Sequence, residues 1–260
     1  MTGRFEGRVA VVTGAGSGIG AATAKLLARE GAAVTVADID LDAAAAVVAE
    51  LAGEGARAQA LATDVGSSAD VEQMLDATVD AFGGLDILVN NAGILRLGQL
   101  VEVSDEAWEE TIRTNLSSVF YCSRGAARRM IGQGRGGRIV SISSIHAVLS
   151  NPNAGPYTAA KGGIEALSRT LASEVAEHGI TVNCVRPGAT WTSLSRPYYT
   201  PPVLAALDQR VPLKQIAQPE WIADAVAHFA SDAARYCTGT TLDVDGGYVM
   251  HGGLADLTYA

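Results

Sequence analysis

Short apolar runs alternate along this chain with longer segments whose apolar residues recur at helical spacing. The first run, RVAVVTG at 8–14, is rich in β-branched residues and ends in glycine, which is typical of a buried parallel strand. The next segment, 18–31, carries helix formers and stops at Gly31. The same alternation predicts further strands at 33–38, 56–62, 85–90, 138–143, 180–185 and 240–245, and helices at 41–52, 68–82, 104–131, 156–178 and 219–231.

This alternation of strands and helices predicts a fold of the α/β class. The strands are almost continuously apolar, so helices must cover both faces of a parallel sheet, and right-handed crossovers make such a sheet doubly wound. We therefore expect residues 1–260 to form a single domain with about seven parallel strands. Residues 187–218 break the pattern and are expected to be irregular. Within them, the predicted lid at 191–215 begins with a stretch, 191–212, that holds four prolines and two adjacent tyrosines. We expect irregular backbone there that acts as a substrate lid, with a plain surface excursion as the alternative.

The composition excludes several classes of function. The 260 residues include 19 Lys and Arg against 28 Asp and Glu, a net charge of −9, whereas nucleic acids and anionic membranes bind clustered basic residues. Three distant cysteines without a CxxC pair, and four histidines without HExxH spacing, indicate neither a disulfide framework nor a metal site. No apolar run reaches membrane length and the start is unlike a signal peptide, so we expect a cytoplasmic protein.

A glycine-rich segment, TGAGSGIG at 13–20, follows the first predicted strand and opens the first predicted helix. Gly14 permits a sharp turn, Gly18 lets the backbone approach a diphosphate, and Gly20 allows the helix to pack closely on the strand. Unpaired N–H groups at the start of a helix bind anions. The segment therefore predicts a Rossmann-type dinucleotide site, with tight packing and no nucleotide as the alternative.

Asp38 ends the second predicted strand, about 20 residues after Gly18, and it bears on the choice of cofactor. A carboxylate accepts hydrogen bonds from the adenosine ribose of NAD, but it repels the 2′-phosphate of NADP. Two unit charges about 4 Å apart repel by up to about 4 kcal/mol at an effective dielectric constant of 20, before screening. Neither Ser17 nor Ile39 supplies a compensating positive charge. The sequence therefore predicts NAD.

A Tyr-x-x-x-Lys pair, Tyr157 and Lys161, lies at the start of a predicted helix, and its spacing puts both side chains on one helix face. The preceding predicted strand ends at Ser143-Ser144, and ligands of doubly wound sheets bind at such carboxyl ends. We expect the Lys161 ammonium to stabilise the ionised Tyr157 phenol by up to about 4 kcal/mol. This interaction would lower the phenol pKa, so that the phenol exchanges protons near neutral pH.

Taken together, these motifs resemble the short-chain dehydrogenase/reductase family over essentially the whole chain. The resemblance rests on TGAGSGIG (13–20), Asp64-Val65, NNAG (90–93), Asn115 in TNLSS, Ser144 thirteen residues before Tyr157, Lys161, PGATWT (187–192) and DGG (245–247). It implies an NAD-dependent oxidoreductase that acts on a CH–OH group. It also implies catalytic roles for Asn115, Ser144, Tyr157 and Lys161.

The resemblance also implies a cofactor site and a substrate site. Asp64 and Val65 are expected to hold the adenine, and Thr190 and Thr192 the nicotinamide carboxamide. The full set of expected cofactor contacts is Gly14, Ser17, Gly18, Ile19, Gly20, Asp38, Ile39, Asp64, Val65, Asn91, Ala92, Gly93, Tyr157, Lys161, Pro187, Gly188, Thr190 and Thr192. The candidate substrate contacts are Ser144, Tyr157, His146, which could equally be a loop histidine, and Trp191, a bulky residue where the lid begins.

The substrate stays open between classes. The segments 143–163 and 238–247 look similar to those of bacterial sugar and polyol dehydrogenases, so a secondary alcohol, sugar or polyol, or the matching ketone, is favoured. A 3-oxoacyl-carrier-protein reductase is the main alternative, although those reductases usually use NADPH. A non-catalytic NAD-binding regulator is a third reading, but it would not need Ser144, Tyr157 and Lys161. The family usually assembles as homotetramers, which is our expectation here.

Overall fold

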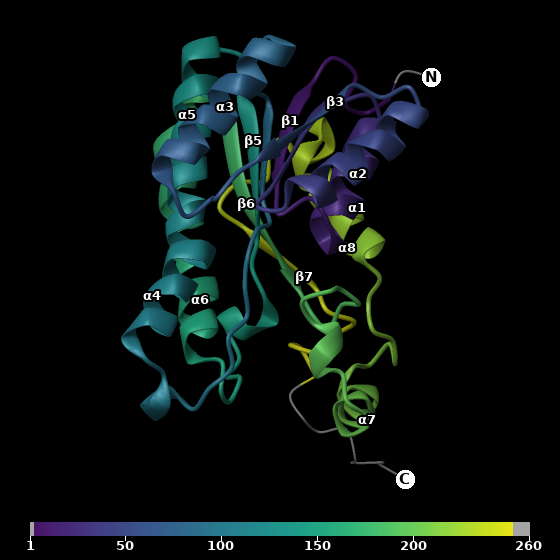
Figure 1. Cartoon of the computed structure of the whole chain (residues 1–260), viewed down its shortest axis with the longest axis vertical. Coiled ribbons are helices and arrows are strands. Elements are labelled where there is room, and N and C mark those ends of the chain that lie inside the picture. Colours follow the sequence, from purple (N-terminus) through teal and green to yellow (C-terminus); the bar gives the residue numbers. More distant parts are fainter. Residues whose placement is uncertain (1–2, 252–260) are drawn as a thin grey trace.

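The computed structural model describes residues 3–251, and within them one sheet of seven parallel strands forms the centre of the molecule (Figure 1). The strand order is β3-β2-β1-β4-β5-β6-β7, which confirms the predicted α/β, doubly wound, Rossmann-type fold. The strands are β1 (Val9–Thr13), β2 (Ala33–Asp38), β3 (Ala58–Ala62), β4 (Ile87–Asn90), β5 (Gly137–Ile142), β6 (Ile180–Pro187) and β7 (Thr241–Val244).

Helices cover both faces of this sheet (Figure 1). One face carries α1 (Gly18–Arg29), α2 (Leu41–Gly53) and α8 (Pro219–Ala230), which bury Leu27, Leu51 and Ile222 against it. The other face carries α3 (Ser68–Phe82), α5 (Ser118–Gln133) and α6 (Gly155–Val175), which bury Leu75 and Met130. The five central strands, β1, β2, β4, β5 and β6, are almost fully buried, as the sequence predicted, whereas the edge strands β3 and β7 are only partly buried.

The chain order places an opening at one edge of the sheet. The first strand, β1, pairs with β2 on one side and with β4 on the other. The chain therefore builds the sheet outward from β1 in one direction through β2 and β3, and then in the opposite direction from β4 onward. Ligands of doubly wound sheets bind at the carboxyl ends of the strands beside such a reversal. Thr13 and Asn90 lie at these ends, so the fold brings the glycine-rich segment next to the NNAG segment.

The prediction of one continuous helix at 104–131 is wrong, because the helix is interrupted in its middle. The structure has α4 (Asp105–Ile112), then a π-helical turn (Arg113–Ser117), then α5. Such turns carry one extra residue and are frequent at functional sites. Here the wide turn holds Asn115, whose side chain is buried against the backbone of Ile94. Because this partner is distant in sequence, the helical pattern of 104–131 does not reveal the interruption.

The expectation of irregular backbone across 187–218 is also wrong in part. A helix, α7 (Pro201–Arg210), lies within the segment, and a short 3₁₀ turn (Arg196–Tyr198) precedes it. Pro201 and Pro202 occupy the first turn of α7, where proline loses no intrahelical hydrogen bond. The prolines therefore start a helix rather than exclude one. No residue of α7 is buried, so the helix lies on the surface.

Candidate active site

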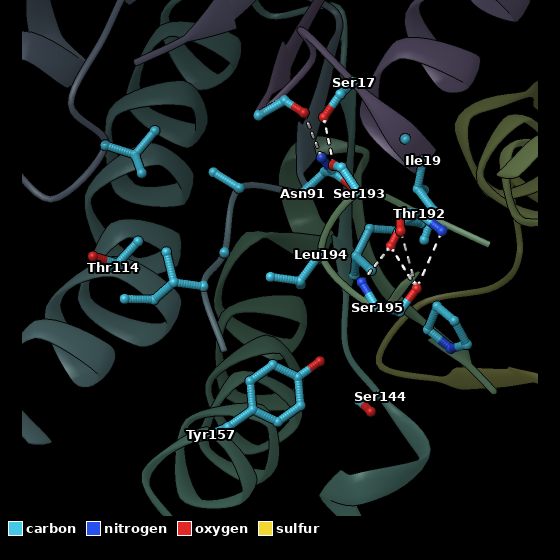
Figure 2. Close-up of a pocket in the computed structure, with 18 of the residues that line it drawn as sticks. Ser17, Ile19, Asn91, Thr114, Ser144, Tyr157, Thr192, Ser193, Leu194 and Ser195 are labelled. Carbon is cyan, nitrogen blue, oxygen red and sulfur yellow. Dashed lines mark hydrogen bonds between the residues drawn. The ribbon is translucent and has the colours of Figure 1, made fainter. Parts of the chain in front are cut away.

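A cleft of about 550 Å³ opens at the carboxyl ends of the central strands (Figure 2). Figure 2 shows Ser17 and Asn91 at one end of it and Ser144 and Tyr157 at the other. Most of the site residues predicted from the sequence line this one cleft, although they come from distant parts of the chain. They are Gly14, Ser17, Gly18, Ile19, Asp38, Ile39, Asp64, Val65, Asn91, Ala92, Gly93, Ser144, Tyr157, Lys161, Pro187, Gly188, Thr190 and Thr192.

The glycine-rich turn has the conformation and the close contacts that require glycine. Gly14 and Gly18 have positive φ angles of 61° and 55°, which side chains other than glycine rarely adopt. A methyl group on Gly20 would collide with the carbonyl oxygen of Gly14, so Gly20 lets α1 approach the turn. The Asn91 amide donates 2.9 Å hydrogen bonds to the carbonyls of Thr13 and Gly14 and so joins the end of β4 to the turn.

Asp38 faces this turn from the end of β2. Its Oδ2 accepts a 2.8 Å hydrogen bond from the Gly16 N–H, and its Oδ1 accepts one of 3.0 Å from the Asp40 N–H. Two backbone donors therefore hold the carboxylate in place, half-buried at the edge of the cleft. The side chain that follows it, Ile39, is 76% exposed and carries no charge.

Asp64 and Arg113 form an ion pair on the cleft wall, and Arg113 was not predicted. The Arg113 guanidinium donates to Asp64 Oδ2 at 2.9 Å. Burial favours a raised pKa for the Asp64 carboxyl, but the hydrogen bonds from Arg113 and from the Gly66 N–H outweigh it and hold the pKa below its usual value. Arg113 lies in the π-helical turn, and no local sequence signal indicated that it would reach across to Asp64.

Ser144, Tyr157 and Lys161 meet at the other end of the cleft. The buried Lys161 ammonium lies 5.5 Å from the centre of the Tyr157 ring and donates a 2.7 Å hydrogen bond to the Ile142 carbonyl. The prediction that Lys161 lowers the pKa of the Tyr157 phenol is wrong. Burial raises the pKa of Tyr157, although the Ser144 hydroxyl opposes this rise. Burial also lowers the pKa of Lys161 to about 8, which weakens its charge at alkaline pH.

Asn115 lies beside the cleft rather than on its surface. Its Oδ1 accepts a 2.7 Å hydrogen bond from the Ile94 N–H, and its Nδ2 donates one of 2.9 Å to the Ile94 carbonyl. The side-chain amide is thus engaged by a single backbone partner and is completely buried. This pairing fixes the segment after β4 against the π-helical turn, so the Asn115 side chain acts as a tether between the two.

Two of the candidate substrate residues do not line the cleft. His146 follows Ser144 in a 3₁₀ turn, and burial lowers the pKa of its imidazole. Trp191 packs edge-on against Tyr199, with ring centres 5.1 Å apart, and lines a second hollow on the other side of the glycine-rich turn. Asn90, the first residue of NNAG, is buried and donates to two serine hydroxyls on neighbouring elements.

A buried ionic network lies beneath Ser144 and Lys161. Ser143 Oγ donates to Glu165 Oε1 at 2.6 Å, and Arg186 donates to both Glu165 oxygens at 2.9 and 2.8 Å. Arg186 also donates to Asp243 at 2.6 Å. The network joins the residue that follows β5 to α6, β6 and β7. Glu165 stands one helical turn after Lys161, and that spacing was the only sequence signal for it.

The start of the predicted lid forms part of the cleft wall, through Ser193, Leu194 and Ser195 (Figure 2). Tyr199 lines the same cleft. Ser193 Oγ lies 3.2 Å from Ser17 Oγ, so the segment touches the glycine-rich turn directly. Across residues 3–251 no three His, Cys, Asp or Glu side chains cluster closely enough to hold a metal ion. In the same range no helix combines the length and apolarity needed to cross a membrane.

Comparison with known proteins identifies the group to which the chain belongs. A family model described as Enoyl-(Acyl carrier protein) reductase matches residues 14–249. The 3-oxoacyl-[acyl-carrier-protein] reductase FabG of Escherichia coli is 43% identical, over 95% of this chain and 99% of its own length. The cis-4-hydroxycyclohexanecarboxylate dehydrogenase of Sinomonas cyclohexanicum is 43% identical (94% and 97%), and the D-threitol dehydrogenase of Mycolicibacterium smegmatis is 38% identical (95% and 95%).

Solved structures agree with these relatives. A short-chain type dehydrogenase/reductase from Mycobacterium marinum superposes with a TM-score of 0.91 at 34% identity, covering 94% of this chain and 96% of that one. A 7α-hydroxysteroid dehydrogenase complexed with NADH has the same score and identity (94% and 95%). So does a gluconate 5-dehydrogenase from Burkholderia cenocepacia in complex with NADP and tartrate (96% and 98%). The protein therefore belongs to the short-chain dehydrogenase/reductase family, whose members use a nicotinamide cofactor, and is an oxidoreductase acting on the CH–OH group.

Proposed function

We propose that this protein is an NAD-dependent dehydrogenase that interconverts a small secondary alcohol, such as a sugar or polyol, with the matching ketone. The observation that carries the proposal is the Asp38 carboxylate, which backbone N–H groups hold in the same cleft as Tyr157. One end of the cleft suits an adenosine ribose, and the other end carries hydroxyl and ammonium groups suited to proton transfer. In this proposal the dinucleotide lies along the glycine-rich turn and joins these two ends of the cleft.

The charges along the cleft favour NAD over NADP. A 2′-phosphate next to Asp38 would meet a carboxylate already fixed by two N–H donors, and such a phosphate carries about −1.5 to −2 charges. The cations that line the cleft are Lys161, at the opposite end, and Arg113, which is paired with Asp64. Neither is free to neutralise a phosphate at Asp38. Relatives with either cofactor exist, so this local arrangement of charge is the ground for choosing NAD.

The catalytic end supplies the proton chemistry. When bound, the nicotinamide supplies hydride transfer. Tyr157 exchanges a proton with the substrate oxygen, Ser144 donates a hydrogen bond to that oxygen, and Lys161 binds the nicotinamide ribose. Because burial raises the pKa of Tyr157, its phenol is protonated at neutral pH and is ready to donate its proton to a ketone. Asn115 contributes by holding the segment after β4 in place.

The substrate is proposed as a small alcohol because the Ser144 and Tyr157 hydroxyls line the cleft together with apolar side chains such as Ile94 and Leu194. The D-threitol and cis-4-hydroxycyclohexanecarboxylate dehydrogenases act on alcohols of this size. A 3-oxoacyl-carrier-protein reductase is the second candidate, favoured by the 43% identity to the Escherichia coli enzyme. In that case the protein would reduce a carrier-bound 3-oxoacyl chain.

The decisive experiment measures NAD- and NADP-coupled absorbance at 340 nm over a panel of polyols, sugars, secondary alcohols, ketones and a 3-oxoacyl thioester. We expect kcat/KM to be higher with NAD, and we expect Asp38→Asn to shift the preference toward NADP by at least about tenfold, or about 1.4 kcal/mol. Asp42→Asn removes the same charge from the exposed first turn of α2 and should leave the preference unchanged. A wild-type preference for NADP would reject the cofactor assignment.

We also propose a homotetramer in the cytoplasm. Large apolar side chains on α4 and α5 remain exposed, among them Trp108 (41%) and Phe120 (42%), and an interface would cover them. The three cysteines are unpaired, which suits a reducing compartment. Light scattering that gives the mass of a single chain would contradict the assembly.

A further inference from the structure

Tyr199 reaches from the predicted lid into the cleft and occupies a specific pair of backbone groups. Its Oη accepts a 2.9 Å hydrogen bond from the Thr190 N–H and donates one of 3.2 Å to the Thr190 carbonyl. The phenol thus occupies the Thr190 N–H, and it shares the Thr190 carbonyl with the Ser195 hydroxyl, which donates to it at 2.5 Å. Both residues line the cleft that holds Tyr157.

A primary carboxamide makes the same pair of hydrogen bonds, because its oxygen accepts and its NH₂ group donates. Thr190 is one of the residues expected to contact the nicotinamide carboxamide, so this step rests on the proposed function. The phenol and the carboxamide cannot both bind the Thr190 backbone. Burial raises the pKa of Tyr199, which keeps its hydroxyl proton in place and so preserves its ability to donate.

We propose that Tyr199 is a displaceable plug of the nicotinamide site: its phenol substitutes for the carboxamide on the Thr190 backbone and must leave when the nicotinamide end of the cofactor binds. Tyr199 therefore sets the affinity for the complete cofactor but not for its adenosine half. It is a specificity-determining residue that is separate from the catalytic groups.

The surroundings of Tyr199 allow this displacement. The residues on either side of it, the 3₁₀ turn Arg196–Tyr198 and the helix α7, contain no buried side chain. Segments with few buried contacts open at low free energy. Thr190 and Val211, by contrast, are 5% and 2% exposed and anchor the two ends of the segment. Between these anchors Ser193 and Ser195 also make inward hydrogen bonds, but they precede the 3₁₀ turn, so Tyr199 is the inward contact that lies between the 3₁₀ turn and α7.

The test compares the binding of NAD and of ADP-ribose, which lacks nicotinamide, by calorimetry. Tyr199→Phe removes the competing hydroxyl, so we expect it to bind NAD roughly 3- to 10-fold more tightly than the wild type, the range given by one net hydrogen bond. ADP-ribose affinity should not change. Tyr198→Phe is the matched control, because Tyr198 is the neighbouring tyrosine and does not line the cleft; both affinities should stay at their wild-type values.

A second measurement does not depend on a variant of Tyr199. The Trp191 ring packs edge-on against Tyr199, so movement of Tyr199 should change the fluorescence of Trp191. Trp108 and Trp221 are both partly exposed and can be replaced by phenylalanine to isolate this signal. We expect NAD to change the Trp191 emission and ADP-ribose to leave it nearly unchanged.

The outcomes separate this proposal from the one on which it rests. If the wild type binds NAD but Tyr199→Phe leaves that affinity unchanged or lowers it, the plug is wrong and the proposed function stands. An equal gain for NAD and ADP-ribose, or equal Trp191 responses to both, also overturns the plug. If the wild type binds neither compound, the proposed cofactor is wrong and the plug falls with it.

Discussion

Arg186 neutralises a carboxylate that has almost no access to water. The Glu165 side chain is 7% exposed and the Arg186 side chain 12%, and two hydrogen bonds of 2.8 and 2.9 Å join them. Replacing Arg186 with methionine keeps an unbranched side chain of similar length but removes the positive charge. Glu165 would then retain only the Ser143 hydroxyl as a hydrogen-bond donor within this network.

The expected loss of stability is large because a buried charge is left without its partner. Removing one member of a buried ion pair typically costs about 3–5 kcal/mol. For a chain of this size, each kcal/mol lowers the unfolding midpoint by about 2–4 °C, so we expect a decrease of about 6–20 °C. An unpaired buried carboxyl is costly only while it carries its charge. The deficit of Arg186→Met should therefore grow as pH rises from 5 to 8.

The assay is thermal and urea unfolding of the wild type and of Arg186→Met, with Glu165→Gln and the double variant completing a cycle. The double variant should recover much of the loss, because neutral glutamine leaves no unpaired charge. Arg29→Met is the matched control, because Arg29 binds Glu54 through the same two-pronged geometry at the surface, where water screens the charges. If Arg186→Met proves as stable as Arg29→Met, or if its deficit is independent of pH, the reasoning about the buried charge is wrong.

Three further predictions concern the cleft. Tyr157→Phe should lose about 10²- to 10⁴-fold in kcat and still bind NAD in calorimetry, since only proton transfer is removed; near-normal turnover would exclude Tyr157 as the acid/base. The pKa of Lys161 is lowered from 10.5 to about 8, so between these pH values the side chain is protonated in the unfolded chain but not in the folded one. The free energy of unfolding of the wild type relative to Lys161→Met should therefore rise with pH over that range, by on the order of 3 kcal/mol. A pH-independent difference in unfolding free energy would contradict this. Gly20→Ala should lose about 1–3 kcal/mol of stability because its methyl would collide with Gly14, whereas a methyl on Gly53 meets nothing within 4 Å and serves as the control in urea unfolding.

Much of the active site could be predicted because its signals are local. Gly14, Gly18 and Gly20 lie within one turn, and Tyr157 and Lys161 lie one helical turn apart. The rule that parallel strands present their carboxyl ends at one edge then brings these local signals together. Of these residues, Gly14, Gly18, Tyr157 and Lys161 line one cleft in the structure, whereas Gly20 packs beneath the turn.

Other features depend on partners that lie far away in the sequence. The π-helical turn at Asn115 is coupled to Ile94, the Asp64 pair needs Arg113, and no pattern within either segment indicates these contacts. The pKa of Tyr157 was expected to fall because of a nearby ammonium. It rises because the fold buries the phenol, and burial is a property of everything packed around it.

The amino-acid sequence by itself determined the alternation of seven strands with most of the helices, the glycine-rich turn, the Asp38 carboxylate, and the candidate serine, tyrosine and lysine at the other end of the cleft. These follow from backbone preference and residue spacing, which act over a few positions. Only the tertiary structure decided that Trp191 lies outside the cleft, that Tyr199 occupies the Thr190 backbone, and that Glu165 and Arg186 are buried together. Each of these depends on which surfaces pack together and exclude water in the folded protein, and the spacing of residues along the chain does not specify those contacts.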